Sequence, residues 1–215
     1  MARGDSQGLA KFFHRWARVV TLLTAPAAAL LAFFAPEVIW AWSGDAALAA
    51  SAGPLLAVLA LATFIHIQCV LPFQVQLAVG WTSLSIWVNV GAIAITFPSL
   101  LTFVPQFGAI AAAWSWVGVT SLYLMVMLLV FFSRYLQAER ASYLVGDFLV
   151  PSAVCFGTVW LASRFVDLEF DFFPVVIFLG LLFAASTALG YLALRTGILI
   201  ASRGRIAADT SKESV

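Results

Sequence analysis

The residues that could do chemistry in this sequence are polar side chains inside two long apolar stretches. The first stretch carries His66 and Gln74, eight residues apart, and the second carries Ser85 and Asn89, four residues apart. These spacings place each pair on one face of a helix. Because only a tight turn at Gly80 separates the two stretches, we expect their polar faces to be neighbours. Together they predict an aqueous cavity that receives a polar substrate.

Gln76 completes the set of substrate-path candidates, although it points to another side of its helix than Gln74. A structural role is the alternative for the whole set, since Gln, Asn and Ser often join membrane helices by hydrogen bonds worth about 0.6 kcal/mol each. His66 alone is typical of a packing histidine, because no second His or carboxylate lies near it in sequence to form a proton relay.

Enzyme chemistry has little support in the residue patterns. There is no Gly-rich phosphate loop, no metal-ligand spacing and no nucleophile-base arrangement, so we expect no catalytic residue, metal or cofactor. The acidic residues Asp167, Glu169 and Asp171 are typical of a solvated loop. Glu37 is interpreted as the one carboxylate close to the interior of an apolar run, and it is expected to reach the outer interface beside Trp40 and Trp42.

Composition predicts the elements that must position these residues. The 215-residue chain is 63% hydrophobic and only 10% charged, whereas a soluble domain carries about 25% charged residues. Runs of about 20 apolar residues cross a bilayer, and the fold class is therefore predicted to be all-α, a polytopic bundle of about six transmembrane helices. The predicted spans are Val19–Trp42, Leu48–Ala78, Leu84–Val104, Ala109–Phe132, Leu144–Ser163 and Phe173–Leu194. Pro72 is predicted to kink the second span, and Cys69 and Cys155 are read as buried hydrophobes.

Basic residues predict which side of the membrane each loop occupies. Of the 11 Lys and Arg residues, only Arg164 falls in the loops on one side, and all the others fall before the first span, between the fourth and fifth, or after the sixth. Positive loops stay in the cytoplasm, so both termini are expected there, with the chain in a cell membrane (inner or plasma membrane). The asymmetry predicts a lipid bilayer as partner, and no nucleic acid.

The predicted organisation has five segments. Residues 1–18 form a basic amphipathic cytoplasmic segment, which either lies in the headgroup layer or extends the first helix into the cytosol. Residues 19–132 form a four-helix membrane part, 133–143 a cytoplasmic loop, 144–200 two further spans and 201–215 a cytoplasmic tail.

Several short motifs, taken in order, resemble one family of membrane transporters. The motifs are Gly4-Asp5, Ala35–Asp45, Gln76–Thr82, Asn89 and Gly108–Trp114. Over about residues 4–132 the chain resembles the C-terminal half of the flippases of lipid-linked oligosaccharides and polysaccharides, which belong to the multidrug/oligosaccharidyl-lipid/polysaccharide superfamily. In fourteen-helix members, this register makes the six spans helices nine to fourteen.

The resemblance implies transport of a polyprenyl-diphosphate-linked glycan for cell-surface polysaccharide biosynthesis, by bundles that alternate access around a central cavity. It also implies a partial or split transporter that lacks the N-terminal helices, and whose partner is the missing N-terminal half or another copy. No Lys or Arg lies at mid-span, which departs from the basic cavity of such flippases. The alternative is a non-catalytic membrane scaffold or accessory protein.

Overall fold

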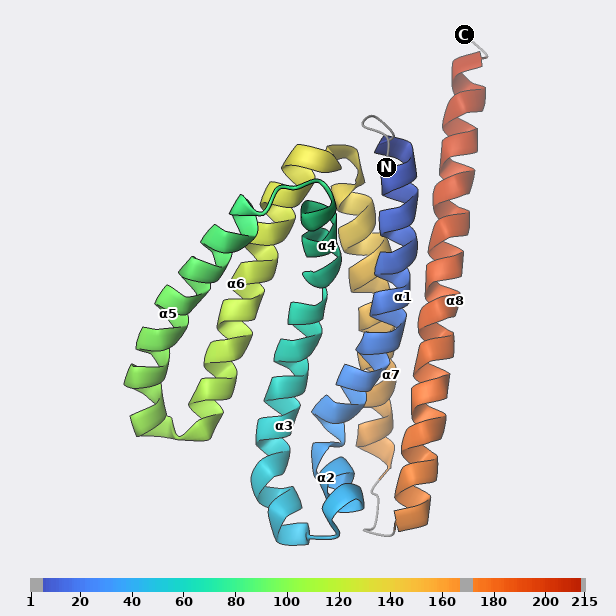
Figure 1. The fold of residues 1–215 in the computed structure, drawn as a ribbon. Helices are drawn as coiled ribbons and strands as arrows, with labels where there is room; N and C mark the ends of the chain where they lie inside the picture. Colours follow the sequence, from blue (N-terminus) through green and yellow to red (C-terminus); the bar gives the residue numbers. More distant parts are fainter. Residues whose placement is uncertain (1–5, 167–171, 214–215) are drawn as a thin grey trace.

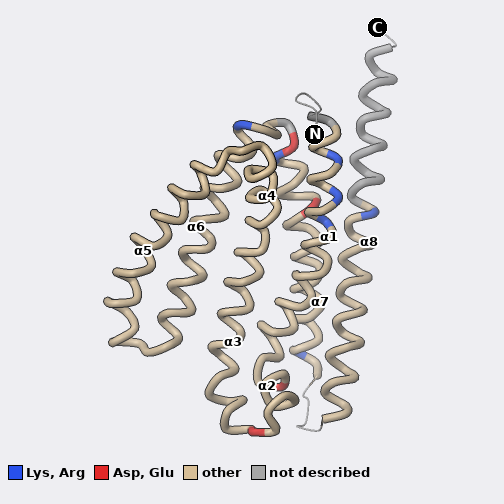
Figure 2. The backbone as a smooth tube through the Cα atoms, in the orientation of Figure 1, with Lys and Arg blue, Asp and Glu red and all other residues tan. Residues whose placement is uncertain are grey.

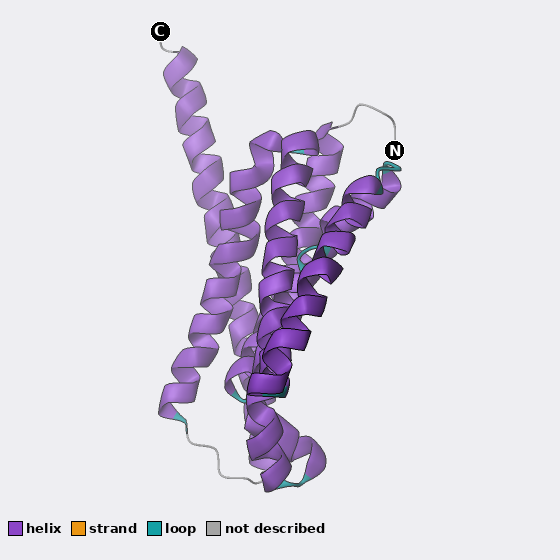
Figure 3. Cartoon of the chain, turned by 90° about the vertical axis from the view of Figure 1, so that its left-hand side faces the viewer, coloured by secondary structure: helices purple, strands orange, loops and turns teal. Residues whose placement is uncertain are grey.

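The protein is an all-helical bundle with the length and composition of a multi-pass membrane protein. The computed structural model describes residues 6–166 and 172–213, and side chains within 8–137, 139–166 and 172–196. The described part of the chain contains no strand (Figure 3). Six of its helices are long and apolar enough to cross a membrane, which confirms the predicted fold class.

The helices follow one another with short connections (Figure 1). Their bounds are α1 Ser6–Phe33, α2 Ala35–Ser43, α3 Ala46–Ile67, α4 Val70–Ala78, α5 Ser83–Phe107, α6 Ala109–Tyr135, the 3₁₀ turn η1 Gln137–Glu139, the π-helix η2 Ser142–Leu149, α7 Val150–Phe165 and α8 Phe172–Glu213.

The first membrane-length helix lies about ten residues earlier than predicted. The first span was predicted to run from Val19 to Trp42, but its apolar helix covers Gly8–Phe33 and the helix breaks at Phe34. Pro36 follows at the start of α2, where it cannot donate to a carbonyl of α1. The short α2 then packs against α3, where a Cβ on Gly53 would lie 2.9 Å from Pro36 Cγ.

Residues 6–18 continue directly into the first span instead of forming a helix of their own. The helix α1 runs unbroken from Ser6, and Phe13 and Ala17 are buried against the rest of the bundle. The apolar face of this amphipathic segment therefore packs against the helices around it.

The kink predicted at Pro72 is confirmed by a break between α3 and α4. The helix α3 ends at Ile67, the chain turns at Gln68 and Cys69, and α4 begins at Val70. Pro72 has no N–H to offer the carbonyl of Gln68, four residues earlier, which is the bond that a continuous helix would need.

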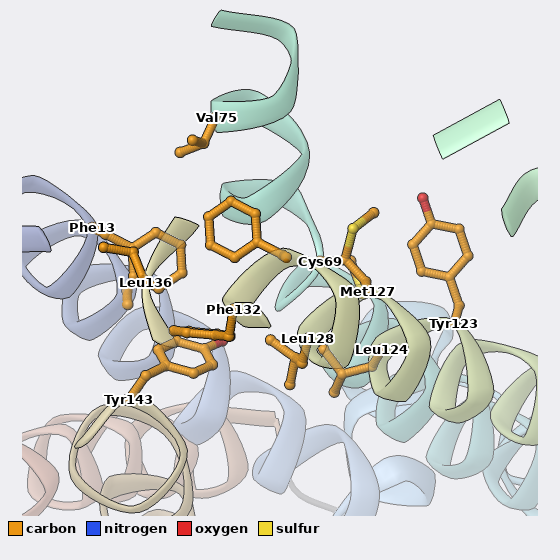
Figure 4. Packing of buried hydrophobic residues seen from close by; sticks show 12 residues of the cluster. Phe13, Cys69, Val75, Tyr123, Leu124, Met127, Leu128, Phe132, Leu136 and Tyr143 are labelled. Carbon is orange, nitrogen blue, oxygen red and sulfur yellow. The ribbon is translucent and has the colours of Figure 1, made fainter. Parts of the chain in front are cut away.

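The core lies where α1, α3, α4, α6 and η2 meet. Phe13 stacks on Phe131 with ring centroids 5.4 Å apart, and its ring also meets the edges of Phe132 and Tyr143. Figure 4 shows this cluster continuing through Leu128, Leu124 and Met127 along α6. By contrast, α5 packs mainly against α6, on one side of the bundle, and almost all its side chains are exposed or half-buried.

Charged residues are divided between the two ends of the bundle. Figure 2 shows most of the described Lys and Arg residues gathered at the end where α1 begins and where η1 joins α6 to η2. Arg164 lies at the opposite end, in the last turn of α7. The structure therefore places polar groups of α1, η1 and η2 close together at one end.

Candidate functional site

A four-residue ionic cluster joins α1 to the segment after α6. His14 and Arg18 lie one helical turn apart on α1, while Glu139 comes from η1 and Asp147 from η2. His14 Nδ1 contacts Asp147 Oδ2, His14 Nε2 lies 3.0 Å from Glu139 Oε2, and Arg18 Nε donates to Asp147 Oδ1 at 2.7 Å. Each oxygen of the Asp147 carboxylate therefore has its own cationic or hydrogen-bonding partner.

Burial within this cluster changes from one side to the other. The Asp147 side chain is 2% exposed and that of His14 12%, whereas Arg18 is 32% and Glu139 39% exposed. A buried carboxylate is stable only when charged or hydrogen-bonding partners replace the lost water. The cluster thus reaches from an exposed carboxylate at the end of the bundle to a buried one inside it.

The backbone and one aromatic side chain position Asp147. The π-helix of η2 widens the turn that carries it, a local form often found at functional sites. One turn before it, Tyr143 is buried with its ring 5.2 Å from those of Phe13 and Phe132. Because Phe13 immediately precedes His14, the same aromatic packing aligns α1 and η2 and brings the imidazole to the carboxylate.

Sequence reasoning missed this cluster. The interpretation of Glu37 as the one carboxylate close to a span interior is wrong, because Asp147 lies inside the predicted fifth run and is buried. One available signal was a lone aspartate inside an apolar run, which is costly unless it is partnered. The four-residue spacing of His14 and Arg18 was the second signal.

Four of the five predicted path residues gather on one side of α6. Gln76 and Ser85 are buried, with Ser85 Oγ donating to Gln76 Oε1 at 2.8 Å and Gln76 Nε2 lying 2.7 Å from Met127 Sδ. Asn89 Nδ2 donates to the Ser85 carbonyl at 2.7 Å. The His66 ring lies 5.9 Å from that of Tyr123, one turn of α6 from Met127.

Three of the five candidate side chains are exposed on the outside of the bundle. His66, Gln74 and Asn89 are exposed, although all three lie in membrane-length apolar segments. Gln74 lies on α4 beside the buried Val75, away from the Gln76 hydrogen bonds. The structure thus joins Gln76, Ser85 and Asn89 directly, brings His66 to the same helix face, and leaves Gln74 outside the network.

Two cavities lie between α5 and α6, and their walls are mostly apolar. One has a volume of about 520 Å³ and is lined by residues that include Phe103, Phe107 and Trp114. The other, of about 300 Å³, has Trp87 and Tyr123 in its wall. None of the five path candidates lines either cavity. The predicted aqueous cavity therefore stays a prediction.

Two further polar groups are buried without full hydrogen bonding. Thr21 Oγ1 donates to Gln68 Oε1 at 3.4 Å, while Gln68 Nε2 and Glu37 Oε2 are buried and have no hydrogen-bond partner. The acidic loop residues Asp167, Glu169 and Asp171 lie outside the described residues. Within the described part of the chain, no three His, Cys, Asp or Glu side chains are arranged to hold a metal ion.

Comparison with known proteins finds no relative of this chain. No family model matches the sequence, and no curated protein or solved structure matches the chain.

Proposed function

We propose that the protein is a membrane transporter of the flippase type, which moves a polyprenyl-diphosphate-linked oligosaccharide across a cell membrane during cell-surface polysaccharide synthesis. It acts as the C-terminal six-helix part of a transporter, together with an N-terminal half or a second copy of itself. The N-terminus lies in the cytoplasm, because the basic end of the bundle carries the start of α1 and the α6–η2 connection. The C-terminus lies on the same side, because six spans return the chain to it.

The observation that carries this proposal is the exposure of polar side chains within the spans. His66 on α3, Gln74 on α4 and Asn89 on α5 are exposed at positions where lipid would otherwise surround them. Polar groups facing hydrocarbon are costly, so such residues usually face a water-filled path or a neighbouring protein surface. A water-filled path along the side of α6 that faces α3, α4 and α5 would hydrate these side chains.

The lipid-linked glycan as substrate rests on the sequence motifs. The segments Gln76–Thr82 and Gly108–Trp114 resemble flippase segments, and in the structure they lie at the end of α4 and the start of α6. Both motifs lie within the region from α4 to α6, and α4 and α5 carry four of the five path candidates, all except His66. Rigid-body alternation of this part against a partner bundle is the corresponding mechanism.

A specific observation favours a second function, that of a membrane scaffold or accessory protein. The Ser85, Gln76 and Met127 side chains satisfy one another's hydrogen bonding inside the bundle. Such bonds typically hold membrane helices together. In that case the polar residues stabilise α4, α5 and α6 against one another, and no solute passes along them.

A reconstituted flipping assay distinguishes the two functions. The purified chain is placed in liposomes that contain a fluorescent polyprenyl-diphosphate-linked disaccharide, alone and together with the N-terminal half of a lipid-linked oligosaccharide flippase. Transport predicts that the probe of the inner leaflet flips to the outer leaflet, where an added membrane-impermeant quencher reaches it, at a rate well above that of protein-free liposomes in at least one arrangement.

The variants Asn89→Leu and His66→Leu sharpen the test. Transport predicts a slower rate for both with unchanged folding, whereas a Trp42→Leu control, at an exposed position outside the polar set, keeps the wild-type rate. Absence of flipping in both arrangements removes the transporter proposal and leaves the scaffold function.

A further inference from the structure

His14 lies between two carboxylates, one facing each of its ring nitrogens. Nδ1 contacts Asp147 Oδ2, and Nε2 lies 3.0 Å from Glu139 Oε2. Ionised carboxylates only accept hydrogen bonds, and a neutral imidazole carries a single N–H. Both contacts can therefore be hydrogen bonds to ionised carboxylates only when the ring holds two protons, as imidazolium.

The other charged groups around the ring balance this state. Arg18, on the same helix, bonds the second oxygen of Asp147 and gives the cluster two cations and two anions. Tyr143 is the other ionisable group of η2, and no described Lys, Arg, Asp, Glu or His side chain belongs to η2 besides Asp147. The described ionisable side chains on the other packed elements are Lys11 and Arg15 of α1, Glu37 of α2, His66 of α3, Tyr123, Arg134 and Tyr135 of α6, Cys155 and Arg164 of α7, and Tyr191 and Arg195 of α8, with Arg140 between η1 and η2.

Loss of one proton from the ring would break one contact and keep the other. Asp147 is 2% exposed, so its Oδ2 atom cannot exchange His14 for water without a large desolvation cost. Glu139 is 39% exposed and can be hydrated again. The remaining N–H therefore stays at Nδ1, and the bare Nε2 faces the lone pairs of Glu139.

We propose that His14 is a proton-binding site, open to the aqueous phase at the basic end of the bundle, whose occupancy ties η1 to α1. When the proton leaves, the Nε2–H bond breaks, the proton passes to water and the lone pair stays on Nε2. The Glu139 contact is then lost and η1 separates from α1. At lower pH the ring takes up a proton at Nε2 and the tie forms again. This inference is independent of the proposed transport function.

Nitrogen NMR of the labelled imidazoles tests the binding step directly. The chain has only two histidines, so a His66→Ala variant of the full chain in detergent micelles leaves His14 as the single imidazole signal. In a titration from about pH 5 to pH 9, which extends beyond the ordinary range of histidine, we expect two protonated nitrogens at the acid end. At the alkaline end we expect a proton on Nδ1 alone. A ring that keeps one protonation state throughout overturns the proposal.

Hydrogen exchange of residues 136–141 tests the tie to η1. Relative to the unstructured chain at each pH, wild-type protection of these amides should fall about tenfold as His14 loses its proton, the equivalent of one charge-assisted hydrogen bond. In a His14→Gln variant, protection should be low at every pH, because the imidazolium is absent.

A Glu139→Gln variant keeps the test valid if His14→Gln fails to fold. The contacts among His14, Arg18 and Asp147 remain, and the Glu139 carboxylate is replaced by an amide that can either accept a hydrogen bond from Nε2 or donate one to it. We expect a folded protein in which the pH dependence of protection at 136–141 disappears. The Asp45→Asn control removes an exposed carboxylate but keeps a good N-cap for α3, so its pH dependence should match wild type. Equal pH dependence in Glu139→Gln and wild type overturns the proposal.

Discussion

At the scale of single residues, Asp147 is the group whose burial needs the most compensation. Its carboxylate is held inside the bundle by His14 and Arg18, both from another helix. Such a group contributes little net stability compared with an apolar side chain, but removing one partner leaves an uncompensated charge. Substitution of Asp147 or of either partner should therefore destabilise the protein, even though Arg18 is about a third exposed.

An Asp147→Asn substitution should destabilise the bundle by about 3 kcal/mol, the lower end of the cost of breaking a buried ion pair. The lower end applies because Arg18 is 32% exposed and can regain water. Unfolding in detergent, followed by circular dichroism against denaturant, measures the change. Glu139→Gln, which affects only the exposed acceptor, should cost under about 1 kcal/mol. Equal losses for the two substitutions would contradict the burial argument.

The hydrogen bonds of Gln76 belong to the same scale. Gln76→Leu and Ser85→Ala should each cost about 0.6 kcal/mol, the average for interhelical hydrogen bonds in membranes. Because each variant removes the same 2.8 Å bond, the double variant should cost less than the sum. A double-mutant cycle by detergent unfolding measures this coupling. Simple additivity would show that the bond contributes nothing to stability.

At the scale of elements, close helix contact depends on Gly190 of α8. A Cβ at this position would lie 2.8 Å from Cys155 Sγ on α7 and 3.2 Å from Leu22 Cδ2 on α1. Cys155 is fully buried, so its sulfur has little room to move. Gly190 thus allows α1, α7 and α8 to pack together, whereas Gly180 on the same helix has open space where a Cβ would lie.

Gly190→Ala should therefore destabilise the bundle by about 1 to 3 kcal/mol, the range for overpacking a core, while Gly180→Ala should stabilise it by up to about 1 kcal/mol through the higher helix propensity of alanine. Thermal unfolding in detergent compares the two variants. Adding Cys155→Ala to Gly190→Ala removes the clashing sulfur and should restore part of the loss. If Gly190→Ala is as stable as Gly180→Ala, the close approach of α7 and α8 is wrong.

At the scale of the whole molecule, the ends of the bundle differ in charge, and this difference supports the proposed orientation. Ala47 follows the α2–α3 turn, whereas Gln137 lies in η1 at the basic end. Both are exposed, and the native Cys69 and Cys155 are buried, so a substituted cysteine can be labelled with little background.

In intact cells, an Ala47→Cys variant should react with a membrane-impermeant maleimide, and a Gln137→Cys variant should react only after the membrane is opened. The physical reason is the retention of positive loops in the cytoplasm. Labelling of both variants from outside would contradict an odd number of spans between the two positions. The reverse pattern would invert the proposed orientation.

The number, order and helical type of the spans were predictable from the sequence, because a run of apolar residues of membrane length is a local property. The kink at Pro72 was predictable for the same reason, since a missing N–H acts four residues away. The start of the first span was not. Its helix continues through the basic residues Lys11 and Arg15, because Phe13 and Ala17 find partners on other helices.

Only the tertiary structure decided the ionic cluster. His14 and Asp147 are separated by 133 positions, and no local pattern shows that α1 and η2 lie side by side. The same limit applies to Gln76, which the sequence set apart from Gln74 but could not join to Met127. Such contacts depend on which helix faces meet, and that is settled by the summed packing of the aromatic core around Phe13 and Tyr143.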